Sequence, residues 1–307
     1  MTELLTIAPE VEDALADRRP VVALESTIIA HGLPWPQNLE TAQALEQAVR
    51  DHGATPATIA VIDGQPQIGL DEASLRMVAD PEAEFRKAST RDLAALRISL
   101  QHGATTVAAT MRLAHLAGIR VFATGGIGGV HRGWTEDMDV SADIYELART
   151  PVAVVCAGAK TILDVPTTLE LLESLGVPVI GYRCDLFPGF YARETESSVQ
   201  TRVETTGEAA AIFAVHRMIA ADCGVVVAVP PPADSALPRE EVEGWIAAAL
   251  RNARDDGITG KASTPYLLKR IVELSEGRSL AANVALARHN AGIAAELATA
   301  VSALGLR

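Results

Sequence analysis

Short runs rich in Val and Ile recur along this chain, and stretches with helical character separate them. The composition of these runs is typical of strands that are buried on both faces of a sheet. They predict strands at Val21–Glu25, Thr58–Asp63, Thr105–Ala109, Arg120–Thr124, Val152–Cys156, Val177–Gly181 and Val225–Val229. Such alternation favours a three-layer α/β/α fold with a mixed, largely parallel sheet.

The helical stretches have recognisable beginnings and ends. Helices are expected at Leu39–His52, Thr90–His102, Ile144–Arg149, Thr167–Leu175 and Glu208–Asp222, and Arg239–Arg254, Pro265–Glu276 and Leu280–Leu304 make the C-terminal third helical. A capping-box pattern begins at Ser89, and Pro166 and Gly176 bracket one helix in the expected order. No repeat or linker divides the chain, because the proline run at Pro230–Pro232 is short. We therefore predict a single domain over residues 1–307.

Composition and net charge indicate the kind of core and argue against one class of function. The chain is 49% hydrophobic but only 4% aromatic, so its core is expected to consist of Ala, Val, Leu and Ile. Its net charge of −13 argues against a general nucleic-acid surface. A small phosphorylated ligand stays possible, because a pocket can be positive within a negative protein.

The cysteines, the first residues and the apolar runs predict where in the cell the protein is located. Cys156, Cys184 and Cys223 lie far apart and form no metal-type pair, which favours free thiols in a reducing cytoplasm. The first 19 residues have no basic start and no apolar core, so we expect no secretion signal. No apolar run approaches the length that spans a membrane.

A lysine stands where an apolar run ends in a small-residue turn, in the segment Val155–Lys160. In an α/β protein this place is the rim of the sheet, where ligands bind. The amine of a free lysine has a pKa of about 10.4, so deprotonating it at pH 7 costs roughly 4.6 kcal/mol. Burial or a second cation lowers the pKa and therefore lowers this cost. Lys160 is a candidate nucleophile on this pattern, and the alternative is a lysine that extends from a strand end into solvent.

A carboxylate ends the first predicted strand, in the segment Ala23–Thr27. Burial would raise the pKa of Glu25 and would suit it to donate a proton. The alternative is a glutamate that caps the following turn. The residues alone do not distinguish the proton donor from the turn cap.

Two further motifs lie in the middle of the chain. Thr124–Gly129 has glycines at a strand end, but their spacing is wrong for a dinucleotide fingerprint, so either the backbone approaches an anion or the loop is flexible. Asp137, Asp139 and Asp143 offer carboxylates of the kind that Mg²⁺ or Mn²⁺ uses. Their spacing alone favours a solvated acidic turn that caps the next helix.

Other polar residues could bind a phosphate or a base. Arg86 and Lys87 precede a predicted helix, and Thr105–Thr110 adds hydroxyl groups, although isolated cations are more often ordinary surface charges. Asn283 and Asn290 share one face of the last helix. An amide there could read a nucleobase edge or could bond to a neighbouring loop.

Taken together, these segments resemble the pseudouridine-5′-phosphate glycosidase family, also called indigoidine-synthase-A-like proteins, from about Val21 to Glu296. The matching stretches, in the same order, are ALESTIIAHGLPWPQNLETA, PATIAVIDG, RKASTRDL, ATTVAATM, FATGGIGGVHRG, DVSADI, VVCAGAKTILDVPTTLELLESLGVPVIGY, GKASTPYLL and SLAANVALARHNA. Trp35 and Gly189 depart from the residues common in the family, Tyr and Ala. These departures concern packing or loop shape, not the reaction.

The resemblance implies the reversible cleavage of pseudouridine 5′-phosphate to uracil and ribose 5-phosphate. It implies that Lys160 attacks C1′ and forms a Schiff base, and that Glu25 donates a proton. It also implies a divalent cation, Mn²⁺, held by Asp139, and a homotrimer.

Substrate-site residues follow from the same resemblance. Lys87 would contact the substrate and help to hold the phosphate, and Val107 would contact the substrate through its backbone. The substrate site would be lined by Ser141, Ala142 and Asp143. Asn283 would read the base, and His131 would be a nearby polar group.

Two other functions stay open on the sequence. One is a Schiff-base lyase or aldolase that acts on another sugar phosphate with the same lysine. The other is a non-catalytic protein that binds or senses a phosphosugar. Related sequences are also associated with indigoidine pigment pathways.

Overall fold

The computed structural model describes residues 4–220, 222–258 and 263–305, except for a few side chains among them. One sheet of 11 strands forms its centre. Its main path runs, in spatial order, through β1 (Thr6–Ile7), β4 (Gln65–Ile68), β3 (Thr55–Ile62), β2 (Val21–Leu24), β7 (Val121–Ala123), β8 (Ala153–Cys156), β11 (Val225–Ala228), β9 (Val179–Tyr182) and β10 (Thr201–Val203). Off this path, β6 (Gly103–Thr105) pairs with β3 and with β5 (Arg86–Ala88).

The strand pairs are parallel except for β3 with β4 and β3 with β6. The central strands β2, β8 and β11 are buried along their whole length. Valine and alanine dominate them because both faces are covered by helices. The fold is therefore α/β with a mixed, mostly parallel sheet, as predicted.

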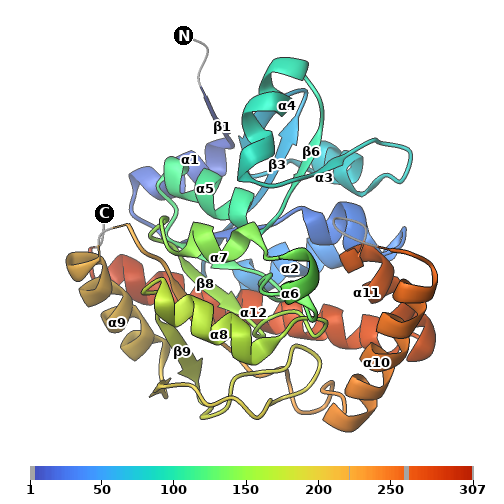
Figure 1. The fold of residues 1–307 in the computed structure, drawn as a ribbon. Coiled ribbons are helices and arrows are strands. Elements are labelled where there is room, and N and C mark those ends of the chain that lie inside the picture. The colour runs from blue at the N-terminus through green and yellow to red at the C-terminus, as the bar shows by residue number, and fades with distance from the viewer. Residues whose placement is uncertain (1–3, 221, 259–262, 306–307) are drawn as a thin grey trace.

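Helices cover both faces of this sheet (Figure 1). One face carries α2 (Gln37–Asp51), α9 (Thr206–Ile219) and α12 (Arg278–Ala303), and α12 packs on both of the others. The other face carries α5 (Val107–Ala117), α7 (Ala142–Leu147) and α8 (Val165–Ser174). Right-handed crossovers in opposite directions from the middle of the sheet place helices on opposite faces.

The C-terminal third is helical, as predicted. Before α12 come α10 (Arg239–Asp255) and α11 (Ser263–Leu274), which pack on each other beside the main body (Figure 1). The part of the GKASTPYLL motif at residues 260–262 lies outside the described residues. None of the described helices is long and apolar enough to cross a bilayer.

The predicted strand Thr105–Ala109 is wrong. Strand β6 ends at Thr105, and α5 begins at Val107 because the Thr106 hydroxyl accepts a hydrogen bond from the Ala109 amide and caps the helix. The predicted helix Thr90–His102 is shorter and divided, into a 3₁₀ turn at Thr90–Asp92 and α4 (Leu93–Ser99).

The sequence reading missed several short elements. They are α1 (Pro9–Ala16), a π-helical turn at Ile28–Gly32, α3 (Glu72–Ala79), α6 (Trp134–Asp137) and the strands β1, β4, β5 and β10. Segments this short carry little periodicity, and edge strands lack the apolar run of a central strand. All the strands in the described part of the chain join one sheet. The single-domain organisation stays a prediction.

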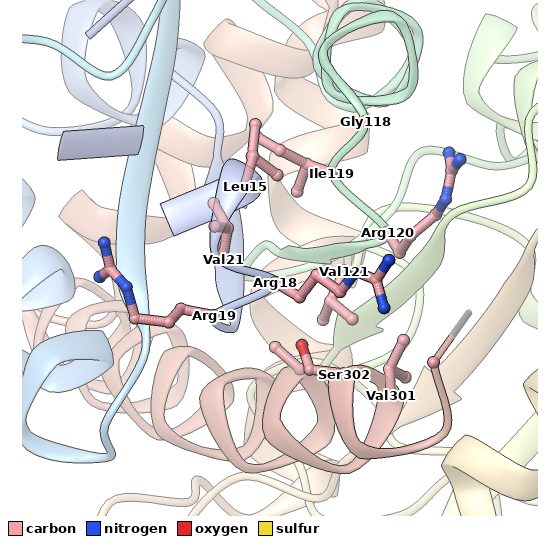
Figure 2. A pocket seen from close by; sticks show the side chains of 12 residues that line it. Leu15, Arg18, Arg19, Val21, Gly118, Ile119, Arg120, Val121, Val301 and Ser302 are labelled. Atoms are coloured by element: carbon pink, nitrogen blue, oxygen red, sulfur yellow. The ribbon is translucent and has the colours of Figure 1, made fainter. Parts of the chain in front are cut away.

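One cavity of about 220 Å³ lies at the amino ends of β2 and β7, next to the end of α12. Its charged lining residues among the described ones are Arg18, Arg19 and Arg120, whose side chains point in different directions (Figure 2). Arginine stays protonated and offers neither a nucleophile nor a proton donor at neutral pH. The chemistry of this fold therefore has to be sought at the opposite ends of the strands.

Candidate active site

The order of the strands marks the place where a ligand site is expected. Strand β2 leads through α2 to β3 on one side, while β7 leads through α7 to β8 on the other. The loops that leave the carboxyl ends of β2 and β7 thus diverge, and they leave a crevice between them. Glu25 is the first residue after β2, and Thr124 is the first residue after β7.

A cavity of about 450 Å³ opens at this crevice. It gathers most of the predicted site residues: Glu25, Lys87, His131, Asp139, Ser141, Ala142, Asp143 and Lys160. A smaller cavity of about 60 Å³ shares Glu25, Thr27, Lys87 and Lys160 with it and is closed by Phe190, Leu268 and Asn283. Segments far apart in the sequence therefore meet in one place.

Val107 is the exception among the predicted residues. Its side chain is buried at the start of α5, and its neighbour Thr106 lines the cavity instead. A contact through the Val107 backbone stays a prediction.

Glu25 is buried and bonded at the end of β2. The Thr124 hydroxyl donates a hydrogen bond to its carboxylate. The pKa of Glu25 is raised, first because burial penalises the charged form, while the charge of Lys160 and the Thr124 bond act in the opposite direction. A raised pKa is what a proton donor near neutral pH needs.

Hydroxyl groups fix the backbone around Glu25. The Thr105 amide donates to the Ser26 hydroxyl at 2.8 Å, and the Thr27 hydroxyl donates to the Thr105 carbonyl at 2.8 Å. The Thr105 hydroxyl in turn donates to the Ile59 carbonyl at 2.6 Å. These bonds tie the end of β2 to β6 and β3, so the glutamate is held by a rigid frame.

Lys160 and Lys87 both reach the cavity. The Lys160 amide donates to the Ile127 carbonyl at 3.0 Å, which ties the lysine segment to the glycine loop after β7. The pKa of Lys87 is lowered, first by burial of its amine and then by the charge of Lys160, although Lys87 as a whole residue is exposed. Lys87 therefore places a second cation near Lys160 in the same cavity.

The glycines after β7 are required by close packing. A Cβ at Gly128 would lie 2.2 Å from the Ser141 hydroxyl oxygen, and one at Gly126 would lie 2.7 Å from the Phe190 ring. Side chains at these positions would clash with the site, so the glycines serve to bring the backbone close to its neighbours rather than to loosen the loop.

Asp143 is not part of a solvated acidic turn, which corrects the interpretation that its spacing favoured. It is buried, and its carboxylate accepts hydrogen bonds from the Ala108 amide at 2.9 Å and the Gly128 amide at 2.7 Å. This one side chain thus joins the start of α5 to the glycine loop. The tertiary contacts outweigh local spacing because a buried carboxylate needs donors.

Asp139 and His131 lie together at the edge of the cavity, with the Asp139 Oδ2 and the His131 Nδ1 3.8 Å apart. No group of three or more His, Cys, Asp or Glu side chains among the described residues could hold a metal ion, and the Asp137 side chain is not described. A cation that keeps most of its waters needs only one or two carboxylates. The oxygen of Asp139 fits a hydrated Mn²⁺ of that kind.

The two asparagines of α12 have different positions. Asn290 is buried, and its Nδ2 donates to the Thr124 carbonyl at 2.9 Å, so it supports the end of β7. Asn283 lines the small cavity, and its buried Oδ1 accepts no hydrogen bond from the described residues. An acceptor of this kind fits the N–H of a nucleobase.

Sequence reasoning missed several lining residues. Thr27 and His31 follow β2, and Ser89, Thr90 and Arg91 follow Lys87, so their nearness to predicted residues was the available signal. Phe190 and Leu268 had no such signal, because they come from distant segments and are ordinary apolar residues.

Comparison with known proteins shows the family to which the chain belongs. Residues 10–300 match the family model described as indigoidine synthase A like protein. The chain is 52% identical to a pseudouridine-5′-phosphate glycosidase of Caldanaerobacter subterraneus, covering 99% of both chains, and 54% identical to one of Deinococcus radiodurans, covering 98% of this chain and 96% of that one.

Solved structures extend the likeness to the fold. The prealnumycin C-glycosynthase AlnA, in complex with ribulose 5-phosphate, superposes with a TM-score of 0.92 at 39% identity over 99% of both chains. An indigoidine synthase A-like protein of Thermotoga maritima superposes with a TM-score of 0.88 at 32% identity over 98% of both chains.

Proposed function

Because the chain belongs to the indigoidine synthase A like protein family, we propose that it is a pseudouridine-5′-phosphate glycosidase. It cleaves the carbon–carbon bond between C1′ of ribose 5-phosphate and C5 of uracil, and the reaction is reversible. The observation that carries this proposal is the meeting of Glu25 and Lys160 in one cavity. The names of the relatives and the phosphosugar bound by AlnA support the same chemistry.

The carbon leaving group explains why a lysine is needed. A glycosidase with two carboxylates protonates an oxygen or nitrogen leaving group. Here the leaving atom is C5 of uracil, and a carbon atom is a poor leaving group. In our mechanism the uncharged Lys160 amine attacks C1′, the C1′–O4′ bond breaks, and Glu25 gives its proton to the ring oxygen. This opens the sugar and leaves the amine bonded to C1′.

Loss of the base completes the cleavage. The Glu25 carboxylate, which has just given its proton to the ring oxygen, takes a proton from the C1′-bound nitrogen and passes it to C5 of the base. The freed nitrogen lone pair then forms a C1′=N bond, and the electrons of the C1′–C5 bond restore the C5=C6 double bond of uracil. Water then hydrolyses the Schiff base, which releases ribose 5-phosphate and returns the Lys160 amine. The proton-donor role suits Glu25 because burial raises its pKa.

Binding roles follow from the two cavities. Lys87, Ser141 and Ala142 line the larger cavity, where the phosphate would bind, and Asn283 faces the smaller cavity, where uracil would bind. Asp139, with His131 close to it, would hold a hydrated Mn²⁺ near the phosphate. When bound, this cation would neutralise phosphate charge.

The surface supports self-association, and we extend the proposal to a homotrimer. The last turns of α9 expose Val215, Met218 and Ile219 at 55%, 83% and 80% of their surface. An exposed apolar group of this kind is typical of a surface that contacts another protein. Beside these residues, the buried Nε atoms of Arg120 and Arg217 have no acceptor among the described residues. We also propose a cytoplasmic location, because the cysteines among the described residues are free thiols, as is usual in a reducing compartment.

One experiment tests the function directly. Purified protein is incubated with uracil, ribose 5-phosphate and Mn²⁺, and formation of pseudouridine 5′-phosphate is followed chromatographically together with the reverse cleavage. A C-nucleotide whose formation is lost on adding a chelator supports both the reaction and the metal. Cleavage of simple aldol substrates instead would favour a Schiff-base lyase, and binding without turnover would favour a phosphosugar-binding protein.

A further inference from the structure

Arg132 directly follows His131, which lines the larger cavity. The Arg132 side chain instead contacts the turn at residues 160–163, called the lysine turn below. Its Nε donates to the Leu163 carbonyl at 3.3 Å, and its Nη2 donates to the Thr161 carbonyl at 3.5 Å. Both carbonyls belong to the turn that begins at Lys160, whose own carbonyl accepts from the Leu163 amide at 3.0 Å. Arg132 therefore contacts the segment that presents the nucleophile without entering the larger or the smaller cavity.

The same guanidinium holds a helix of the C-terminal third. Its Nη1 and Nη2 donate to the two carboxylate oxygens of Glu243 on α10, at 2.9 and 3.0 Å. Helix α10 packs on α11, and α11 contributes Leu268 to the wall of the smaller cavity. One arginine thus connects the lysine turn to the helix pair that helps to close the site.

This connection matters because a lysine side chain is long and flexible. Attack requires the amine to lie within about 3–3.5 Å of the sugar carbon, and a displacement of 1 Å can cost about 100-fold in rate. The Ile127 carbonyl holds the Lys160 amide on one side of the turn. Arg132 holds the turn at two further points, the Thr161 and Leu163 carbonyls.

We propose that Arg132 is a positioning residue for Lys160, and that Glu243 orients Arg132 and so couples α10 to the nucleophile turn. The inference rests on the proposed function, because it assigns a purpose to the position of Lys160. Only arginine can make this set of contacts, since its planar fork offers a bidentate face to a carboxylate and further donors to carbonyls.

Stability alone does not account for the arrangement. The side chains of Arg132 and Glu243 are 34% and 47% exposed, and ion pairs with that exposure add little to folding stability. A purely structural role therefore predicts a small effect on every property. A positioning role predicts a large effect on turnover with almost none on folding.

The test compares this pair with a matched one on the same helix. Arg239, also on α10, pairs with Glu196 of a surface loop and makes no hydrogen bond to the lysine turn. Arg132→Gln, Arg132→Lys, Glu243→Gln and the control Arg239→Gln are assayed for kcat, KM and thermal unfolding. The rate at which borohydride traps ribose 5-phosphate on the enzyme is measured in parallel.

We expect Arg132→Gln to lower kcat and the trapping rate by about 10- to 100-fold with KM changed less than about threefold. Arg132→Lys should recover part of this loss, Glu243→Gln should lose less than Arg132→Gln, and Arg239→Gln should stay within about twofold of the wild type. The unfolding temperatures of all variants should agree closely, as expected for exposed pairs.

Two outcomes would overturn the inference: equal effects of Arg132→Gln and Arg239→Gln, or a loss confined to KM. The proposed function has a separate readout. If the wild type fails to cleave pseudouridine 5′-phosphate, that function fails, while the trapping rates still decide the role of Arg132.

Discussion

Glu25 and Lys160 approach the same cavity from two parallel strands, β2 and β8, that are separated in the sheet by β7. The charge of Lys160 is the largest influence that lowers the pKa of Glu25, against the burial that raises it. Lys160 thus affects the protonation of Glu25, although the two residues are 135 positions apart in the sequence. An acid and an amine placed in this way suit a reaction that needs both.

Lys160→Ala should abolish cleavage, by at least about 1,000-fold, and leave the fold intact because the residue is only partly buried. Mass spectrometry after borohydride reduction with ribose 5-phosphate should place the sugar on Lys160 in the wild type. The adduct on Lys87, which lines the same cavity, would exchange the roles of the two lysines.

Glu25→Gln should lower kcat by about 100- to 10,000-fold, the range for loss of a proton donor. Because the pKa of Glu25 is raised on folding, its stabilising contribution is complete below the unfolded-state pKa and is lost as pH rises through the folded pKa. Glu25→Gln should therefore gain stability relative to the wild type as pH increases. Urea unfolding of both proteins at pH 5 and pH 8 measures this, and a constant difference would contradict the raised pKa.

Asn283→Ala and Asn290→Ala should separate binding from folding. Asn290 donates to the Thr124 carbonyl from a buried position, so its loss should cost about 1–3 kcal/mol of unfolding free energy. Asn283 leaves its acceptor free in the small cavity, so its loss should raise KM for the nucleotide roughly tenfold with little change in stability. Trapping of ribose 5-phosphate, which lacks a base, should be unaffected by Asn283→Ala.

Asp139→Asn should weaken the response to Mn²⁺. One carboxylate supplies most of the protein's charge for a hydrated cation, so the Mn²⁺ concentration for half-maximal activity should rise about 10-fold or more. Titration of chelated enzyme with Mn²⁺ gives this value, and an independent readout is Mn²⁺ binding followed by electron paramagnetic resonance. An unchanged affinity would place the cation elsewhere.

Met218→Glu should reduce the oligomeric state, because it places a charge among the exposed apolar residues at the end of α9. Met77→Glu on α3, where the side chain is 41% exposed, serves as the control. Light scattering coupled to size-exclusion chromatography measures the mass of both variants. If Met218→Glu keeps the mass of the wild type, α9 does not form the contact.

Much of the site was accessible from local pattern. Lys160 and Glu25 each stand just beyond a buried strand, and the carboxyl ends of parallel strands share one edge of a sheet, so their meeting follows from the fold class. Asp143 was not accessible in this way. Its spacing suggested a solvated turn, whereas its oxygens bond to the Ala108 and Gly128 amides, which come from other segments.

The amino-acid sequence by itself determined the class of fold and the chemical groups at the strand ends, because these depend on apolar runs, caps and glycines that act over a few residues. Only the tertiary structure decided which groups face each other. It placed the Thr124 hydroxyl within hydrogen-bond distance of the Glu25 carboxylate, and it placed Lys87 near Lys160. It also placed Arg132 where it bonds both to the lysine turn and to Glu243. Burial and charge–charge distance are properties of the packed chain, and they govern the protonation and the placement on which the chemistry depends.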